Sequence, residues 1–337
     1  MRRRNWLLAV FACCFACWAT ILTSASAGAA EARHLSLSFD QPRGTGISVG
    51  ADIFSAKLAE LSQGTLVIDQ FPGAQLGQDP QAMQKVRTGD IDFSISATAN
   101  LATLTPQSGV LSLHYLFRDD AHLARAIADP ALLAAVQALF DETVQGGHVM
   151  TLLTLGLREL YGKKEIHKVE DLARVKLRVQ ATATEDAIFA AYGAQTVHMP
   201  FGNVYTSLQT GVVDMAENGI NVYQQNKHYE VAPVMSLTGH EANVLTIWMS
   251  DKTLQSLSPE QQGWVRQAAA EAGRTQPARA LELERVAQAN LQKLGVKFVT
   301  DVDKAGFIRL AEPLQDKIAA ELGPHAVRIL QLSRAVK

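Results

Sequence analysis

Apolar and polar residues follow one another with the periods of strands and helices along most of the chain. Near its start, Leu35, Leu37 and Phe39 alternate with polar residues, as the side chains of a half-buried strand do. Strands and helices in alternation predict a parallel sheet that is covered by helices. The first series runs strand, helix, strand, helix, strand over residues 35–39, 50–61, 65–71, 80–87 and 91–95.

A second series of the same kind begins near residue 149. Because no Pro/Ser-rich linker separates the two series, we expect two α/β units joined by the sheet strands themselves, rather than one long sheet. The second series contains predicted strands at 151–155, 175–179 and 212–214 and predicted helices at 185–192 and 203–209.

The final part of the chain is predicted to be mostly helical. Ser258-Pro259-Glu260-Gln261 is a strong helix start, with an N-cap serine, a proline at the first position and a capping-box glutamine. The helical pattern continues to about Leu294, with a kink or break expected at Pro277, because proline removes a backbone hydrogen bond. A short strand at 295–299 and a final pair of helices follow.

The first thirty residues have the order of a secretory signal peptide. Arginines at 2–4 precede an apolar run over 6–22, and small residues at 23–27 end it, so cleavage is expected after Ala27 or Ala30. The alternative is a membrane anchor, because about 17–25 apolar residues can span a bilayer. All three cysteines lie in this segment, so the exported chain would have no disulfide. We therefore expect a periplasmic protein.

The charge of the exported part excludes one class of function. Removing residues 1–30 takes away three arginines and no acid, which leaves 28 basic and 33 acidic side chains. A mildly acidic chain lacks the concentrated basic surface of a nucleic-acid-binding protein. Its length of about 300 residues is typical of two domains with a large core.

No motif in the sequence predicts an enzyme, a metal site or a cofactor. The nine histidines include no i, i+4 pair with an acid, and neither a Gly-x-Ser-x-Gly elbow nor a glycine-rich phosphate loop is present. Asp214 and Glu217 could act as an acid–base pair in principle. Acids that follow a strand are more often solvated or ion-paired, so catalysis is the weaker interpretation.

Two arginines are better candidates for function. Arg178 lies near the carboxyl end of the strand at 175–179, and Arg158 closely follows another predicted strand. Open α/β sheets bind ligands beyond the carboxyl ends of their strands, and a guanidinium group matches a carboxylate with two parallel hydrogen bonds. The alternative is that each arginine pairs with a local acid such as Glu159 or Asp171, and spacing alone leaves both open.

Several segments together resemble the solute receptors of tripartite ATP-independent periplasmic (TRAP) transporters, the DctP-like family. No single segment decides the resemblance, but the set is colinear and covers nearly all of the chain after residue 30. The matching segments lie at 71–72, 75–77, 116–119, 168–172, 176–179, 200–214, 217–218, 227–231 and 257–260.

The resemblance implies an α/β periplasmic binding protein with two lobes, a ligand cleft between them and a long C-terminal helix that spans both. The lobes would comprise residues 31–155 with 244–282, and residues 156–243 with 283–337. Such a receptor closes on an organic acid and delivers it to a small and a large membrane-embedded subunit. The alternatives are a receptor of another uptake or sensory system and, less favoured, a periplasmic hydrolase.

The resemblance also implies the site residues. In the family, the arginine at the position of Arg178 holds the substrate carboxylate, the one at Arg158 assists, and the residues at Asn218 and Phe201 face the pocket. The remaining substrate-binding positions are Asp40, Asp79, Asn100 and Glu241.

Departures from the family pattern bear on the solute. A glutamate and an arginine in the sialate-binding branch are replaced by Ala97 and Asn100, which argues against sialic acid. Glu241 stands where an apolar or aromatic residue is frequent. Acids at the rim of an anion pocket bind hydroxyls or an amine, so we expect a hydroxylated or amino organic acid.

Overall fold

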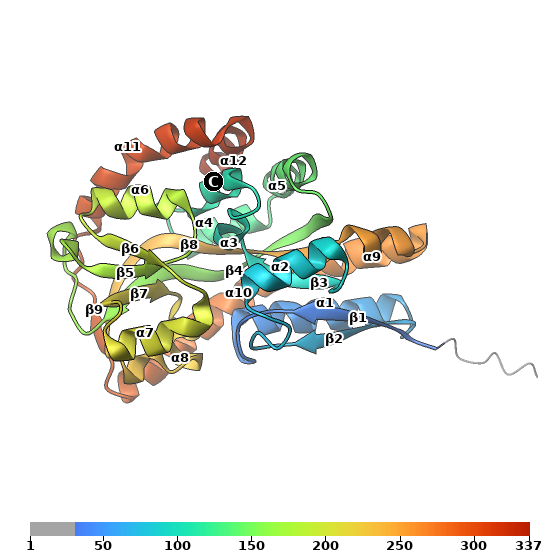
Figure 1. The fold of residues 1–337 in the computed structure, drawn as a ribbon, viewed down its shortest axis with the longest axis horizontal. Coiled ribbons are helices and arrows are strands. Elements are labelled where there is room, and N and C mark those ends of the chain that lie inside the picture. Colours follow the sequence, from blue (N-terminus) through green and yellow to red (C-terminus); the bar gives the residue numbers. More distant parts are fainter. Residues whose placement is uncertain (1–30) are drawn as a thin grey trace, which may run out of the picture. The chain divides into compact units, whose positions relative to one another are not determined.

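The structure, a computed structural model, describes residues 31–337, and within this range residues 32–337 form one compact unit. The predicted signal peptide at 1–30 lies outside the described residues. Nine strands form one sheet in the order β2-β1-β3-β8-β4-β7-β5-β6, and β9 pairs with β8 (Figure 1). The strands are β1 (Arg33–Ser38), β2 (Leu66–Phe71), β3 (Phe93–Ala97), β4 (Gly147–Gly162), β5 (Lys176–Val179), β6 (Gln195–His198), β7 (Met215–Asn218), β8 (Val234–Ser250) and β9 (Lys297–Val299).

Helices cover both faces of this sheet. In Figure 1, α6 and α7 lie on opposite sides of strands β5 to β7. The α-helices are α1 (Gly46–Leu61), α2 (Asp79–Thr88), α3 (Thr98–Leu101), α4 (Asp120–Ile127), α5 (Pro130–Thr143), α6 (Ala183–Ala191), α7 (Val204–Thr210), α8 (Ile220–Gln225), α9 (Asp251–Ser256), α10 (Pro259–Lys293), α11 (Lys304–Leu322) and α12 (Pro324–Ala335). The 3-10 helices are η1 (Pro106–Ser112), η2 (Val169–Leu172), η3 (Phe201–Asn203) and η4 (His228–Glu230).

The sheet is mixed, and it is continuous. β1 is parallel to β2 and β3, and β5 is parallel to β6 and β7, whereas β8 is antiparallel to β3 and β4. The prediction that sheet strands join the two series is confirmed, because β4 and β8 are 16 and 17 residues long and pair along most of their length. The expectation of two α/β units rather than one long sheet is wrong for the same reason, and the sheet is mixed rather than parallel.

The strand predicted at 212–214 is wrong, because the strand in this part of the chain begins only at Met215. Gly211 ends α7 in the left-handed conformation, and Val212 is 56% exposed in the turn that follows. The true strand is β7 (Met215–Asn218), which is buried along its whole length although half of its side chains are polar. Hydropathy favours the apolar pair before the strand, and only the pairing of β7 with β4 and β5 identifies the strand itself.

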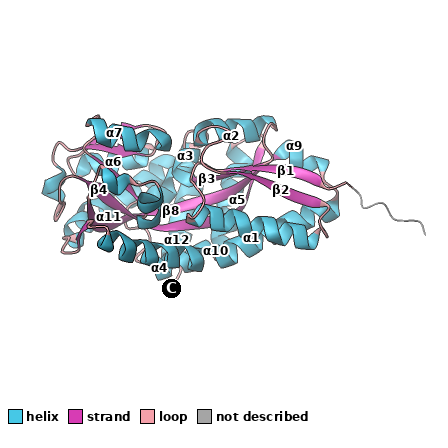
Figure 2. Cartoon of the chain, turned by 90° about the horizontal axis from the view of Figure 1, so that it is seen from below, coloured by secondary structure: helices cyan, strands magenta, loops and turns pink. Residues whose placement is uncertain are grey.

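Helix α10 begins as predicted, with the Ser258 side chain and Gln261 in a capping box. It then continues through Pro277 for 35 residues, so the predicted break is wrong. The helix packs against α1 and β4 along its length (Figure 2), and this packing outweighs the loss of one backbone hydrogen bond.

Close packing joins α10, α1 and β4. A Cβ atom at Gly46 or Gly50 would lie 2.8 or 2.7 Å from a leucine methyl group of β4, so a larger residue at either position would have to displace that side chain. The buried Gln276 of α10 donates to the carbonyls of Gly46 and Thr154 at 3.0 and 2.6 Å. These contacts fix the position of β4, whose later part carries Arg158.

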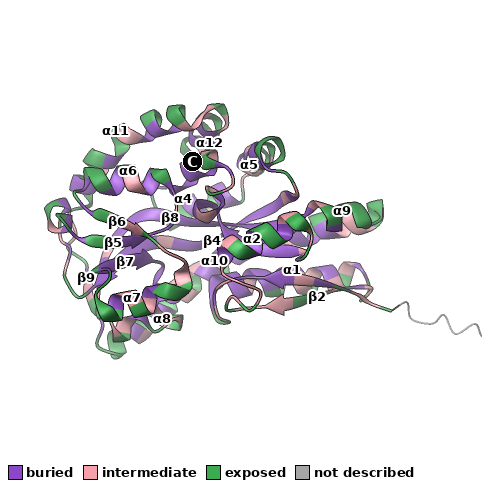
Figure 3. Cartoon of the chain, in the orientation of Figure 1, coloured by how far each residue is buried: buried purple, intermediate pink, exposed green. Residues whose placement is uncertain are grey.

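Most buried residues lie in the strands and on the inner faces of the helices (Figure 3), in three apolar clusters. One cluster centres on β1 to β3 and α1, another on α7, β7 and α8. The largest links α4, α5, α11 and α12, so it includes residues of both proposed lobes. The lobe boundaries given above remain a prediction.

Between residues 31 and 337, no single helix has the length and apolar character needed to cross a membrane. The bent pair α4 and α5, which meet at 65°, satisfies the length and composition criteria only when the two helices are taken together.

Candidate ligand-binding site

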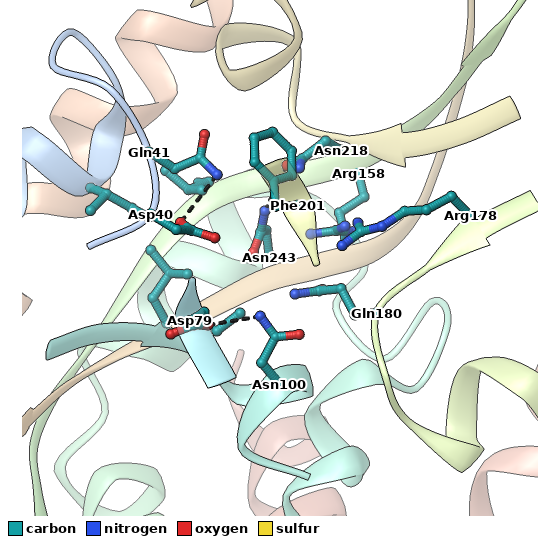
Figure 4. A pocket seen from close by; sticks show the side chains of 14 residues that line it. Asp40, Gln41, Asp79, Asn100, Arg158, Arg178, Gln180, Phe201, Asn218 and Asn243 are labelled. Atoms are coloured by element: carbon teal, nitrogen blue, oxygen red, sulfur yellow. Dashed lines mark hydrogen bonds between the residues drawn. The ribbon is translucent and has the colours of Figure 1, made fainter. Parts of the chain in front are cut away.

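A polar cavity lies where the later part of β4 and the ends of β5 and β7 face the segments that follow β1 and β3 (Figure 4). The free volume between these elements is only about 20 Å³, far below the range of about 300–1,000 Å³ typical of small-molecule sites, so an organic ligand would require the surrounding side chains or segments to move apart. The lining residues are Asp40, Gln41, Ile47, Asp79, Ala97, Asn100, Leu155, Arg158, Arg178, Gln180, Phe201, Asn218, Asn243 and Leu245.

Arg158 reaches the cavity because β4 is irregular at this point. Gly156 has a φ of +84°, and the pairing of β4 with β8 shifts by one residue between Thr154 and Leu157. A bulge of this kind re-aims the side chains that follow it. Arg158 then donates from Nε and Nη2 to the two carboxylate oxygens of Glu217, with Nη2 2.6 Å from Oε1.

Arg178 comes from β5 and is bound differently. Its Nε and Nη2 both donate to the carbonyl oxygen of Met199, at 3.2 and 2.9 Å. The nearest carboxylate is that of Glu217, whose Oε1 lies 3.9 Å from Nη1. The guanidinium carbon lies 5.9 Å from the centre of the Phe201 ring. Nη1 and the second N–H of Nη2 form the end of the guanidinium group, and they remain available to donate into the cavity.

The two buried arginines differ in their electrostatic surroundings. Burial lowers the pKa of Arg158, but the adjacent Glu217 and Glu241 carboxylates more than reverse this, so its pKa lies above the ordinary value. Burial also lowers the pKa of Arg178, and Glu217 at its greater distance does not compensate. An anion beside Arg178 would therefore stabilise its charged form.

Three amide side chains complete the arginine side of the cavity. The Oδ1 atom of Asn218 accepts from its neighbour Gly219 N–H at 2.9 Å and from Asn243 Nδ2 at 3.0 Å. Both contacts fix the orientation of the Asn218 amide, so its NH₂ group is the part that remains for a ligand. Gln180 follows Arg178 by two residues and therefore lies on the same side of the extended chain.

The other side of the cavity is acidic (Figure 4). Asp79 accepts from Ser96 Oγ at 2.6 Å and from Asn100 Nδ2 at 2.7 Å, and Asp40 accepts from Gln41 Nε2 at 3.2 Å. Burial raises the pKa of both aspartates, and that of Asp40 reaches about 7 because the Asp79 carboxylate adds to the effect of burial. The pair can therefore hold a proton near neutral pH.

The structure brings seven of the eight predicted residues to this cavity: Asp40, Asp79, Asn100, Arg158, Arg178, Phe201 and Asn218. The eighth, Glu241, is not among the lining residues; its Oε2 lies 3.6 Å from Arg158 Nε. Sequence reasoning missed Gln41, Gln180 and Asn243. Strand alternation after Arg178 is a signal that could have found Gln180, whereas Asn243 lies on β8, which was not predicted.

The acids considered for other roles have structural partners. Asp214 accepts from the Lys176 N–H at 2.8 Å, and Glu217 pairs with Arg158. Neither local acid named as an alternative partner, Glu159 or Asp171, pairs with these arginines: they accept from the backbone of Gly239 and of residues 167–168. Arg158 does form an ion pair, but its partner Glu217 lies 59 residues away in the sequence.

Comparison with known proteins identifies the family. The profile described as bacterial extracellular solute-binding protein, family 7 (DctP) matches residues 40–322. The chain belongs to this family. The 2,3-diketo-L-gulonate-binding periplasmic protein YiaO of Escherichia coli K12 is 29% identical over 287 residues, which cover 85% of this chain and 87% of that protein.

Solved structures of DctP-family receptors have the same fold. A TRAP periplasmic solute-binding protein of Xanthobacter autotrophicus Py2 with bound β-D-galacturonate has a TM-score of 0.83 and 28% identity, and covers 90% of this chain and 100% of that one. One from Polaromonas sp. JS666 bound to D-erythronate has a TM-score of 0.84 and 26% identity, and covers 90% and 99%. The predicted family and its two-lobed α/β fold are confirmed, and these relatives are binding proteins rather than enzymes.

Proposed function

We propose that this protein is the periplasmic receptor of a TRAP transporter and that its solute is a sugar acid. Its carboxylate binds Arg178, and its hydroxyl groups bind the aspartates on the opposite side of the cavity. The receptor delivers the solute to a small and a large membrane-embedded subunit after export through the signal peptide at 1–30.

The observation that carries this proposal is the unused end of the Arg178 guanidinium group. Its other edge is occupied by Met199, so a carboxylate can bind end-on with two parallel bonds. A carboxylate leaving water needs its charge and lone pairs satisfied, and Arg178 with the oriented Asn218 amide provides this. Arg158 assists through Nη1, which is not used by Glu217.

The acidic side of the cavity favours a ligand with hydroxyl groups at its far end. Asp40 and Asp79 can accept hydrogen bonds from hydroxyls, whereas the second carboxylate of a dicarboxylate would be repelled by the negative charge of this pair. The relatives named above bind a diketogulonate, a galacturonate and an erythronate, which share one carboxylate and several hydroxyls or carbonyls.

The first test is a thermal-shift screen of the purified, ligand-stripped protein. The panel contains hexuronates, aldonates, dicarboxylates, amino acids and neutral hexoses. A ligand that binds only the folded state raises the melting temperature. We expect sugar acids to raise it and the matched neutral hexoses to have no effect. A shift from amino acids alone would instead show that the aspartates bind an amine.

Delivery to the membrane needs a separate test. Cells that express TRAP membrane subunits from the same genome should take up the labelled sugar acid only when this receptor is present. Binding without receptor-dependent uptake by any such pair would point to another uptake system or to a sensory role.

A further inference from the structure

A second cluster of functional side chains lies beside Arg158 but outside the residues that line the solute cavity. His114 follows η1, and His240 and Glu241 lie on β8. One ligand atom from each of the three residues can be chosen so that all lie within 4.8 Å of one another. The two histidines are 126 positions apart in the sequence, so no spacing motif could reveal the cluster.

The cluster contains three buried polar atoms without a partner. Within the described part of the chain, Nε2 of His114, Nε2 of His240 and Oε2 of Glu241 have no hydrogen-bond partner. Each residue is at most 2% exposed. Because buried polar atoms are almost always hydrogen-bonded, these three are candidate ligand atoms, although Oε2 of Glu241 also has Arg158 Nε as an ionic neighbour at 3.6 Å.

The other nitrogen of each histidine has a partner. Nδ1 of His114 lies 3.2 Å from the Tyr192 hydroxyl, and Nδ1 of His240 lies 2.8 Å from the Thr238 hydroxyl. A hydroxyl that accepts from Nδ1–H leaves the lone pair on Nε2, and this arrangement is typical of histidines that ligate metals.

The rings are also held in place by aromatic packing. The centroids of His114 and His240 are 4.8 Å apart, and the Phe189 ring packs edge-on against both, at 4.7 and 5.5 Å. His240 is further fixed by its backbone carbonyl, which accepts from the Tyr115 N–H at 2.7 Å. Ligands with fixed orientation pay less entropy when an ion binds.

Acidic and basic side chains both surround the cluster. Glu185 and Glu217 lie close to Glu241, whereas Arg158 is near all three members of the cluster and Lys304 is near His240. The carboxylates would have to offset these cations when a divalent ion binds.

We propose that His114, His240 and Glu241 bind a divalent transition-metal ion, and that zinc fits this set of two imidazoles and one carboxylate best. Bonds of about 2.0–2.2 Å would draw the three ligand atoms inward. Glu241 also lies 3.6 Å from Arg158, which lines the solute cavity. An ion bound to Glu241 would therefore hold Glu241 in position beside Arg158. This proposal does not depend on the identity of the solute.

The test uses full-length protein purified without a polyhistidine tag. The protein is unfolded, stripped with a chelator, and refolded with Zn²⁺, with Co²⁺ or without metal, because the ligand atoms are buried. We expect about one ion per chain after gel filtration, visible absorption bands of a Co²⁺ site with nitrogen and oxygen ligands, and a raised melting temperature. His240→Gln and Glu241→Gln should lose the ion.

The matched control is His122→Gln. His122 is also buried, but its Nδ1 accepts from Arg118 N–H and its Nε2 contacts the Ser333 carbonyl, so its loss should leave metal content unchanged. Refolded wild-type protein that melts cooperatively but retains no metal and shows no Co²⁺ bands would overturn the proposal. This outcome is measured on wild-type protein, so the test remains decisive even if a variant fails to fold.

Discussion

Arg158 and Arg178 line the same cavity and are almost equally buried, yet their guanidinium groups have different partners. The carboxylate of Glu217 occupies Nε and Nη2 of Arg158, whereas Arg178 has only the Met199 carbonyl and a carboxylate 3.9 Å away. The first arginine is already neutralised by the protein, and the second is not. The comparison shows that the partner of each N–H group, rather than residue type or burial, identifies the arginine that awaits an anion.

The largest effect is expected from removing the partner of Arg158. Glu217→Gln leaves the buried Arg158 guanidinium without its hydrogen-bonded counter-charge and with only Glu241, 3.6 Å away, which should lower the free energy of unfolding by about 3–5 kcal/mol. Urea denaturation measures this change. The control Glu282→Gln removes the exposed partner of Arg285 and should cost at most about 1 kcal/mol. Equal effects of both variants would mean that the Arg158 pair is not a buried charge pair.

A smaller effect is expected from changing the geometry of Arg178 while keeping its charge. Arg178→Lys cannot form two parallel bonds, so affinity for the sugar acid should fall by about 10- to 100-fold, or about 1.4–2.8 kcal/mol. Isothermal calorimetry measures the affinity. The exposed replacement Arg285→Lys should leave it unchanged. Near-normal affinity of the Arg178→Lys protein would argue against an end-on bidentate contact.

The acidic side of the cavity should show itself in the pH dependence of stability. The pKa of Asp40 is near 4 in the unfolded chain and about 7 in the folded protein, so the folded state binds more protons between these values. Stability of the wild type should therefore fall as pH rises from about 4 to 7, relative to Asp40→Asn. Melting temperatures of the two proteins across this range test the prediction, and parallel curves would contradict it.

The smallest effect is expected at Asn243, which orients the Asn218 amide without charge. Asn243→Ala removes one buried hydrogen bond of 3.0 Å, and solute affinity should fall by about 1 kcal/mol, or roughly fivefold. Calorimetry on the variant decides this, with its urea curve as the check on folding. An unchanged affinity would mean that Asn218 needs no support.

These residues also show how far the sequence leads. The position of Arg178 could be predicted because strand period and local composition predict β5, and the family resemblance then suggested the role proposed for it. The pairing of Arg158 with Glu217 could not be predicted. It depends on β4 lying against β7, and the two residues are 59 positions apart in the sequence. β7 itself was misplaced, since a buried strand that contains Glu217 and Asn218 has no apolar pattern.

The missed residues have the same cause. Asn243 lies on β8, a strand of 17 residues whose neighbours β3 and β4 come from much earlier in the chain. Helix starts, by contrast, depend on a few adjacent residues, and the capping box at Ser258 was predicted correctly. Local chemistry is therefore visible in one sequence, whereas contacts across the sheet are not.

The most direct test of the central claim is calorimetry of Arg178→Ala with the sugar acid that gives the largest thermal shift. We predict that binding to wild-type protein is lost in this variant, a change of at least about 2 kcal/mol, while its urea curve stays close to that of the wild type. Glu217, the carboxylate nearest to Arg178, stays hydrogen-bonded to Arg158 in this variant, so no buried acid loses its closest partner. Retention of wild-type affinity by Arg178→Ala would contradict the account.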